Sequence, residues 1–375
     1  MATLAAHPGN AIARSKPRTF TAGFVMEQTL GHVTHTQNLR RLLADEPGLD
    51  VRWLEVPFRP GEALYRLPPV SLNWSLRGSL YARRNLALPP WRNVDALFVH
   101  TMTIALLATP AYRQIPTVIS IDATPRNIDS LGAAYSHHEN PGPVESLKRL
   151  LIRRALRQAK AYVSWSEWAK DSLVKDYGVP ADKILVAPPG TNLGLFRRPD
   201  YRRPGLPRLL FVGGDFLRKG GDLLLDTFRA RLRGKAELHL VTHHPVDPEE
   251  GVFVYTGVGP NSPELLNLFH DADVFTLPTR ADCLAVVLGE AMAASLPIVT
   301  TRVGAHAEAV IDGETGFVIA PDDSDALATA LETLVENEAL RERMGERARI
   351  RAETRFDAHR NALEIVDMMR SVAVH

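Results

Sequence analysis

The sequence contains a single cysteine, Cys283, among 375 residues, so no disulfide can form within the chain. Such a chain is typical of a reducing compartment, and we expect a cytoplasmic location. Long apolar runs are also missing, and no stretch approaches the roughly 20 apolar residues that a transmembrane helix needs. Residues 1–17 lack the apolar core of a signal peptide and are expected to form a disordered leader.

A large net charge is missing as well, because the formal value is only +1. This balance hides a division. Residues 1–205 hold 27 Lys and Arg against 16 Asp and Glu, and the remaining residues hold 17 against 27. Halves of opposite sign suggest two bodies with different partners. The basic half is suited to an anionic membrane surface or acceptor, and mutual attraction of the two halves is the alternative. We expect no nucleic-acid partner.

The sequence does contain a regular alternation of strand-like and helical segments. Apolar strands that lack polar alternation are buried on both faces, so the pattern predicts parallel, doubly wound sheets in two α/β domains. The expected strands are 20–26, 51–56, 96–100, 117–122, 161–165, 184–187, 208–212, 238–242, 252–255, 274–278, 298–301 and 317–320. The clearest expected helices are 35–43, 144–160, 222–232, 264–270 and 286–294.

A joint rich in Pro and Arg, without hydrophobic periodicity, covers residues 196–207. It predicts an N-terminal domain over 18–198 and a C-terminal domain over 199–354. The chain is strongly helical from Asp325 onward, and we expect residues 355–375 to cross back and pack on the N-terminal domain.

The turn after the strand at 208–212 is the first candidate site. Its glycines allow positive φ and close approach of the backbone to a ligand, and the next helix offers free N–H groups. Arg218 and Lys219 add positive charge, which favours a diphosphate. A Walker A loop is excluded because Lys219 precedes its glycine, and the G-x-G-x-x-G fingerprint is absent. A plain surface turn with solvated cations is the alternative.

Asp282 and Glu290 are the second candidate site. We place Asp282 in the loop entering a helix and Glu290 about two turns later, on nearly the same face. Carboxylates accept charge-assisted hydrogen bonds from sugar and ribose hydroxyls, and the N–H groups of 283–286 are available for phosphate. The alternatives are an N-capping Asp282 with an exposed Glu290, and the acid pair of a glycoside hydrolase. The hydrolase is disfavoured because both acids come from one helix.

Taken in order, these motifs resemble family 4 of the glycosyltransferases, which has the GT-B fold. Val212-Gly213 followed by Arg218-Lys219-Gly220 resembles the phosphate loop of that family, and Asp282 to Glu290 resembles its E-x7-E motif. Gly31-His32 resembles the glycine loop of the first strand–helix turn. The resemblance covers nearly the whole chain. It implies two Rossmann-like domains facing a cleft, and retaining, metal-free hexosyl transfer from a UDP- or GDP-linked sugar to an unidentified acceptor.

The resemblance also implies a role for each matched residue. Arg218 and Lys219 neutralise the donor diphosphate as its charge grows. Asp282 holds donor-sugar hydroxyls, Glu290 binds the ribose, and His100 faces the donor sugar across the cleft. The remaining implied donor-binding residues are Gly31, Gly213, Gly214, Leu284, Ala285 and Val286.

The sequence departs from the family at two positions. Gly214 stands where the family usually has Arg, so Arg218 must carry that charge, and Asp282 is one methylene shorter than the usual Glu. A GT-B epimerase and a non-catalytic nucleotide-sugar-binding protein remain alternatives. We expect the acceptor on the N-terminal domain, near residues 65–84 and 129–143, and the basic helix at 148–157 is the candidate for membrane contact.

Overall fold

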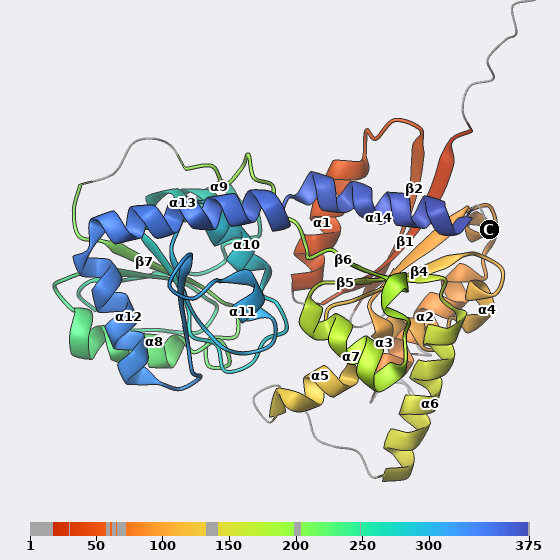
Figure 1. Ribbon diagram of the computed structural model, residues 1–375, viewed down its shortest axis with the longest axis horizontal. Coiled ribbons are helices and arrows are strands. Elements are labelled where there is room, and N and C mark those ends of the chain that lie inside the picture. Colours follow the sequence, from red (N-terminus) through yellow and green to blue (C-terminus); the bar gives the residue numbers. More distant parts are fainter. Residues whose placement is uncertain are drawn as a thin grey trace, which may run out of the picture.

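The computed structural model describes residues 18–29, 31–57, 61, 65, 73–132, 142–198, 204–247 and 249–373. The expected leader 1–17, most of the stretch 129–143 and part of the joint lie outside these residues. The chain folds into two α/β domains, each built on a six-stranded sheet (Figure 1). The prediction of two doubly wound, Rossmann-like domains is confirmed.

The first sheet has the strand order β2-β1-β3-β4-β5-β6, and all its neighbours pair in parallel. β3, β4 and β5 are buried along their whole length, which explains why their sequences show no polar alternation. The strands are β1 Phe20–Gln28, β2 Leu49–Pro57, β3 Ala96–His100, β4 Thr117–Ile121, β5 Ala161–Ser164 and β6 Ile184–Val186.

Helices cover both faces of this sheet, and several of them were not predicted. α7 is one example: the Ser166 hydroxyl caps its start, and Gly178 ends it in the left-handed conformation. The helices are α1 Gly31–Leu43, α2 Trp74–Leu86, α3 Met102–Ala105, α4 Thr109–Tyr112, α5 Pro125–Ser130, α6 Gly142–Gln158 and α7 Glu167–Tyr177, with 3-10 turns η3 Pro89–Trp91 and η5 Ala181–Lys183.

The second sheet has the order β12-β11-β10-β7-β8-β9, again parallel throughout. Its strands are β7 Arg208–Val212, β8 Glu237–Val241, β9 Val252–Tyr255, β10 Val274–Leu277, β11 Ile298–Thr301 and β12 Gly316–Ile319. The helix expected over 222–232 is α8 Gly221–Thr227, which continues into a single π-helical turn, η6 Phe228–Leu232. The other helices are α9 Pro263–Asp271, α10 Val286–Ala293, α11 His306–Ala309, α12 Ser324–Glu336, α13 Glu338–Arg355 and α14 Ala358–Ala373.

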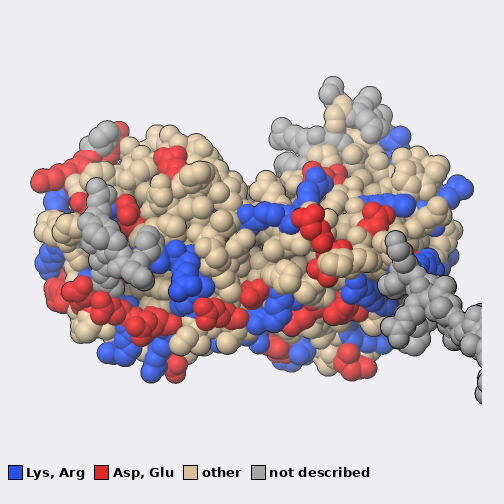
Figure 2. Space-filling view, turned by 90° about the horizontal axis from the view of Figure 1, so that it is seen from above, with Lys and Arg blue, Asp and Glu red and all other residues tan. Residues whose placement is uncertain are grey.

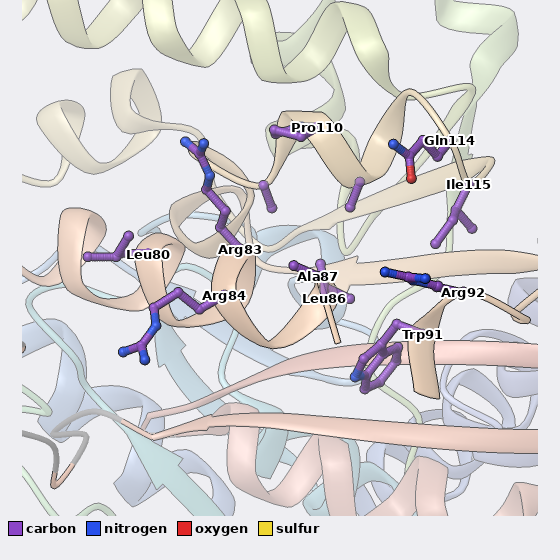
Figure 3. A pocket seen from close by; sticks show the side chains of 12 residues that line it. Leu80, Arg83, Arg84, Leu86, Ala87, Trp91, Arg92, Pro110, Gln114 and Ile115 are labelled. Atoms are coloured by element: carbon purple, nitrogen blue, oxygen red, sulfur yellow. The ribbon is translucent and has the colours of Figure 1, made fainter. Parts of the chain in front are cut away.

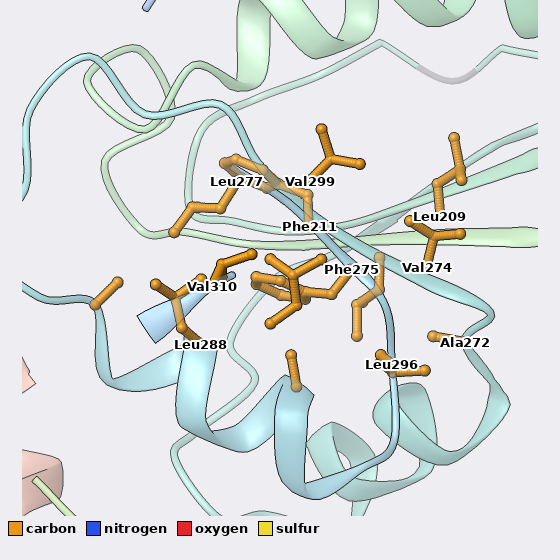
Figure 4. Close-up of a cluster of buried hydrophobic side chains, with 14 of the residues drawn as sticks. Leu209, Phe211, Ala272, Val274, Phe275, Leu277, Leu288, Leu296, Val299 and Val310 are labelled. Carbon is orange, nitrogen blue, oxygen red and sulfur yellow. The ribbon is translucent and has the colours of Figure 1, made fainter. Parts of the chain in front are cut away.

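Part of the core of the C-terminal domain lies between the second sheet and α10 (Figure 4). Phe211 and Phe275 from the central strands meet Leu288 and Leu296, and all four side chains are fully buried. Burial of one such side chain contributes about 1.5–3 kcal/mol. This packing fixes the position of α10 against the carboxyl ends of the central strands.

The C-terminal helix crosses back to the N-terminal domain, as predicted. α13 and α14 follow one another along one side of the molecule, and α14 lies over the first sheet (Figure 1). Its buried face packs against side chains of β1, β3 and β4. At the crossing, the Thr191 N–H donates to the Phe356 carbonyl (2.7 Å) and the Ala358 N–H donates to the Thr191 carbonyl (3.2 Å).

The two domains form separate lobes with a notch between them (Figure 2). Besides the crossing helix, α11 of the C-terminal domain contacts the start of α7. The Glu308 carboxylate accepts hydrogen bonds from the N–H groups of Glu167 (2.8 Å) and Trp168 (2.6 Å). A carboxylate at a helix N-terminus is favourable because it meets the positive end of the helix dipole.

The crossing requires glycine at position 190. A Cβ there would lie 2.2 Å from the Ala358 Cα, whereas a Cβ at Gly259 would have nothing within 4 Å. We expect Gly190→Ala to lower the free energy of unfolding by about 1–3 kcal/mol, the usual cost of overpacking. Gly259→Ala is the control and should leave it nearly unchanged. Thermal and denaturant unfolding measure both, and equal stability of the two variants would contradict the close contact.

Candidate functional site

The candidate site lies where the winding of the second sheet reverses. β7 and β10 are neighbours, and the later strands add outward from each of them. In open parallel sheets such a switch point leaves a crevice beyond the carboxyl ends of the strands. The loop after β7 carries the predicted phosphate motif and the loop after β10 carries Asp282. The topology therefore brings both motifs to one crevice.

The two loops touch through their backbones. Gly220 has a φ of +75°, and a Cβ there would lie 2.0 Å from the carbonyl oxygen of Pro278. Only glycine satisfies both conditions. At the start of the loop, a Cβ on Gly213 would meet the ring of Phe211 at 2.9 Å, while Gly214 has only His243 nearby, at 3.6 Å.

Arg218 connects the same two loops. Its carbonyl oxygen accepts hydrogen bonds from the Arg280 N–H (2.9 Å) and the Thr279 hydroxyl (3.1 Å). Its guanidinium donates to the Ala281 carbonyl (2.8 Å) and to Asp215 (2.8 Å). The charge of Arg218 is thus held at the edge of the crevice between the two motifs.

Lys219 forms an ion pair with Asp282, and both side chains are largely buried. Burial alone would raise the pKa of Asp282, but the positive charges of Lys219 and Arg218 hold this pKa below its usual value. Asp282 is therefore ionised. His306 lies 3.9 Å from it, and burial lowers the pKa of His306 to about 4, so the imidazole is neutral near pH 7.

His306 holds the residue that precedes the first turn of α10. Its Nε2 accepts from the Ala285 N–H (3.4 Å), and its Nδ1 lies 2.9 Å from the Thr300 hydroxyl. Because that hydroxyl donates to the Leu277 carbonyl, His306 Nδ1 must carry the proton. The Ala285 N–H, predicted to contact the donor, has this imidazole as its partner here.

The prediction that Asp282 and Glu290 share a helix face is wrong. α10 begins at Val286, so Asp282 lies four residues before the helix. The loop between Asp282 and α10 is fixed by the connection from β11 to α11, because the Ala305 N–H donates a hydrogen bond to the Cys283 carbonyl (2.8 Å). The N-cap alternative also fails, since the Asp282 carboxylate accepts from the N–H of the next residue.

Glu290 occupies the middle of α10 and is only 6% exposed, so the alternative of an exposed Glu290 is wrong. Burial raises the pKa of its carboxyl to about 7. A carboxyl that titrates near neutral pH changes charge when hydroxyl donors approach, because hydrogen bonds to the ionised form lower its pKa.

The N-terminal domain meets α10 at Gly31. A Cβ at Gly31 would lie 3.5 Å from a methyl group of Val286, so the predicted glycine loop and the start of α10 face one another. His100 lies deeper. It is fully buried, its ring stacks on Trp165 at 4.9 Å, and its Nε2 is 2.8 Å from Nδ1 of His32. The structure places His32, not His100, at the surface of the site.

Arg218, Lys219 and Asp282 thus come together, with Gly31 facing Val286. Sequence reasoning missed His306, which nothing but the fold brings to Asp282. It also missed His32, although His32 follows directly after Gly31 in the motif that was recognised.

The whole-chain architecture matches GT-B enzymes of known structure. Sucrose-phosphate synthase from Thermosynechococcus elongatus has a TM-score of 0.75 and is 17% identical, covering 95% of this chain and 99% of that one. Anabaena Alr3699/HepE, solved in complex with UDP-glucose, has a TM-score of 0.66 and is 15% identical, covering 94% of this chain and 99% of that one. The fold is therefore GT-B.

Sequence comparison gives the family. The model described as Glycosyltransferase Family 4 matches residues 30–195, and the model described as Glycosyl transferases group 1 matches residues 206–337. The chain belongs to the family 4 glycosyltransferases.

Individual relatives match over part of their length. D-inositol 3-phosphate glycosyltransferase from Pseudarthrobacter chlorophenolicus is 32% identical over 48% of this chain and 49% of its own. MMP alpha-(1->4)-mannosyltransferase from Mycolicibacterium hassiacum is 30% identical over 53% and 51%. The chain thus spans about half the length of the curated relatives that it matches.

The buried carboxyl of Glu290 predicts a pH dependence of stability. Its pKa is higher in the folded chain than in the unfolded one, so its contribution is fully present below pH 4.5 and is lost as the pH rises to about 7. Between pH 5 and pH 8 the free energy of unfolding should fall by ~3 kcal/mol more for the native chain than for Glu290→Gln. Urea unfolding at the two pH values measures this difference. Identical pH dependence in both proteins would show that the pKa of Glu290 is not raised in the folded protein.

Proposed function

We propose that the chain is a retaining glycosyltransferase that moves a hexosyl group from a UDP- or GDP-linked sugar to an acceptor hydroxyl, without a metal or other cofactor. The crevice between the loops after β7 and β10 carries this proposal, because two cations, an ionised Asp282 and the start of α10 meet there. Family membership supports sugar transfer. The neighbour solved with UDP-glucose supports a nucleotide sugar as donor.

The cations are placed for the leaving group. When the bond between the sugar and the diphosphate breaks, negative charge grows on the phosphate oxygens. Arg218 and Lys219, together with the N–H groups of Leu284 and Val286, stabilise that charge. Fixed cations at this place supply the charge that a divalent metal provides in other phosphate sites. Metal independence follows from this arrangement as part of the proposal.

Donor binding rearranges the ion pair. The diphosphate competes with Asp282 for Lys219, and Asp282 is then available to accept hydrogen bonds from hydroxyls of the donor sugar. Glu290 accepts from the ribose hydroxyls, which favours its ionised form. Each carboxylate thus takes one part of the donor.

An epimerase and a non-catalytic binding protein need only the nucleotide sugar. The N-terminal domain adds a cavity of about 330 Å³ that includes His32, next to the Gly31–Val286 contact. A second pocket of this size beside the donor crevice favours transfer to an acceptor over both alternatives.

The proposal predicts the behaviour of one variant. Lys219→Ala should lower turnover by about a hundredfold or more while the protein stays folded, because charge stabilisation of the leaving group is lost. Release of nucleoside diphosphate from UDP-, GDP- and ADP-sugars, with analysis of the glycoside formed, measures it. Lys235→Ala, a substitution at an exposed lysine, is the control for Lys219→Ala. In a separate assay, EDTA should leave the rate of the native protein unchanged. Turnover of Lys219→Ala equal to that of the control would reject the site, and an epimerised donor as the only product would favour the epimerase.

We also propose peripheral contact of the N-terminal domain with an anionic membrane surface. Among the described helices, none is both long and apolar enough to cross a bilayer. α6, however, exposes Leu147 and Leu150, at 56% and 63%, on a helix that also carries Arg149 and Arg153. Exposed leucines among arginines are typical of a helix that lies on a lipid surface.

A second feature of the same domain supports this contact. A cavity of about 670 Å³ is lined by Arg83, Arg84 and Arg92 together with apolar side chains that include Trp91 and Ile115 (Figure 3). Its wall includes part of α4, which packs against α6. A lining that combines arginines with apolar side chains suits a phosphate carried on a hydrocarbon body.

Vesicle co-sedimentation tests the contact. The protein should pellet with phosphatidylcholine vesicles that contain phosphatidylglycerol and remain in solution with phosphatidylcholine alone. High salt should release it, because exposed charges are screened. Leu150→Glu should weaken pelleting, whereas Ile350→Glu, at an exposed apolar residue of the other domain, should not. Equal pelleting with both kinds of vesicle would contradict the proposal.

A further inference from the structure

The cavity beside His32 has a position that fits a second substrate. It opens at the carboxyl ends of β1, β3 and β4, where the winding of the first sheet reverses between β1 and β3. Its volume of about 330 Å³ is that of a small-molecule site. His32 lines it, and the preceding Gly31 faces Val286 of the donor crevice. A molecule in the cavity therefore lies next to the start of α10.

One wall of the cavity is polar and acidic. Glu27 is only 5% exposed, and its carboxylate accepts hydrogen bonds from the Thr29 hydroxyl (2.6 Å), the Trp74 indole (3.2 Å) and the Thr101 hydroxyl. Asp122 lies on the next part of the wall, 3.7 Å from Nε2 of His32. These two carboxylates come from different strands, β1 and the end of β4, and only the fold brings them to one cavity.

Much of the remaining lining is apolar. Met102, Leu106, Ile128 and Ile152 form it together with the indole of Trp74. A ring with hydroxyl groups at its edge and C–H groups on its face matches a lining that combines carboxylates with apolar side chains. Its hydroxyls donate to carboxylate oxygens, and its C–H face packs on aromatic and aliphatic carbon.

The charge of the lining disfavours phosphorylated acceptors. Among the described residues that line the cavity, two are Asp or Glu and none is Lys or Arg. A phosphate about 4 Å from one carboxylate is repelled by about 4 kcal/mol per pair of unit charges near a protein surface. A phosphorylated acceptor would meet this repulsion with no Lys or Arg among the described lining residues to pair with it.

We propose that the acceptor of this enzyme is an uncharged, polyhydroxylated ring, a sugar or a cyclitol, bound in this cavity through Glu27 and Asp122. The inference rests on the proposed transferase function and goes beyond it, because it names the substrate class. It sets this chain apart from the matched D-inositol 3-phosphate glycosyltransferases, whose name gives them a phosphorylated substrate.

The test compares acceptors in matched pairs. Glucose, N-acetylglucosamine and myo-inositol are each offered beside their monophosphate esters, with the nucleotide sugar that raises the melting temperature most. We expect transfer to at least one uncharged compound, and at least tenfold less transfer to its phosphate ester. Asp122→Asn should raise KM for the uncharged acceptor at least tenfold, with KM for the donor unchanged.

A second variant keeps the test independent of lost activity. Thr103 lines the cavity, and Thr103→Arg places a cation there, so the ratio of phosphorylated to uncharged acceptor used should rise at least tenfold. Thr329→Arg, on an exposed position of α12, adds the same charge and should leave this ratio unchanged.

Two results would overturn the proposal. One is preferential transfer to phosphate esters by the native chain. The other is a native chain that binds and slowly hydrolyses its nucleotide sugar but transfers to no uncharged compound of the panel. Absence of any nucleotide-sugar binding would instead reject the proposed transferase function, so the two failures are distinguishable.

Discussion

The site depends on the direct backbone contact between the loops after β7 and β10. Gly220 permits it, because any side chain at that position would strike the carbonyl of Pro278. Once the loops touch, Arg218 bonds both of them and Lys219 reaches Asp282. A buried ion pair of this kind is costly to break on one side, by about 3–5 kcal/mol when a partner is removed. The contact therefore places two cations and one carboxylate with a precision that flexible surface side chains lack.

The N-terminal side of the site is rigid for a different reason. Burial lowers the pKa of His35 to about 3 and the pKa of His100 well below its usual value, so both imidazoles are neutral. They pack with Trp165 beneath His32 as uncharged rings. Between the domains, by contrast, the contact of Glu308 with the start of α7 is a surface charge–dipole interaction worth about 0.3–1 kcal/mol. The crossing helix α14 joins the two domains by close packing, and the Glu308 contact adds a weaker link beside the site.

The positions of the strands were predicted well from the sequence, because buried parallel strands have a distinct, apolar composition. The bounds of β3, β7, β9 and β11 agree with the prediction to the residue. The failures concern contacts between distant segments. The loop position of Asp282 and the start of the helix at Val286 were predicted, but Asp282 does not share a helix face with Glu290, and the contact of Ala305 with the Cys283 carbonyl in this loop was not foreseen. His100 ends its strand as expected, yet His32, 68 positions away, covers it. Neither contact has a local signal in the sequence.

The net charge of the N-terminal half differs in sign from the charge of the cavity within it. The first 205 residues are strongly basic, but the cavity beside His32 is acidic. At physiological salt, exposed charges farther apart than about 8 Å are largely screened, so exposed arginines such as Arg149 and Arg153 of α6 act mainly on the surface they occupy. The local carboxylates, Glu27 and Asp122, decide what enters. One domain can then present positive charge to an anionic surface and still select an uncharged molecule, because the two tasks act over different distances.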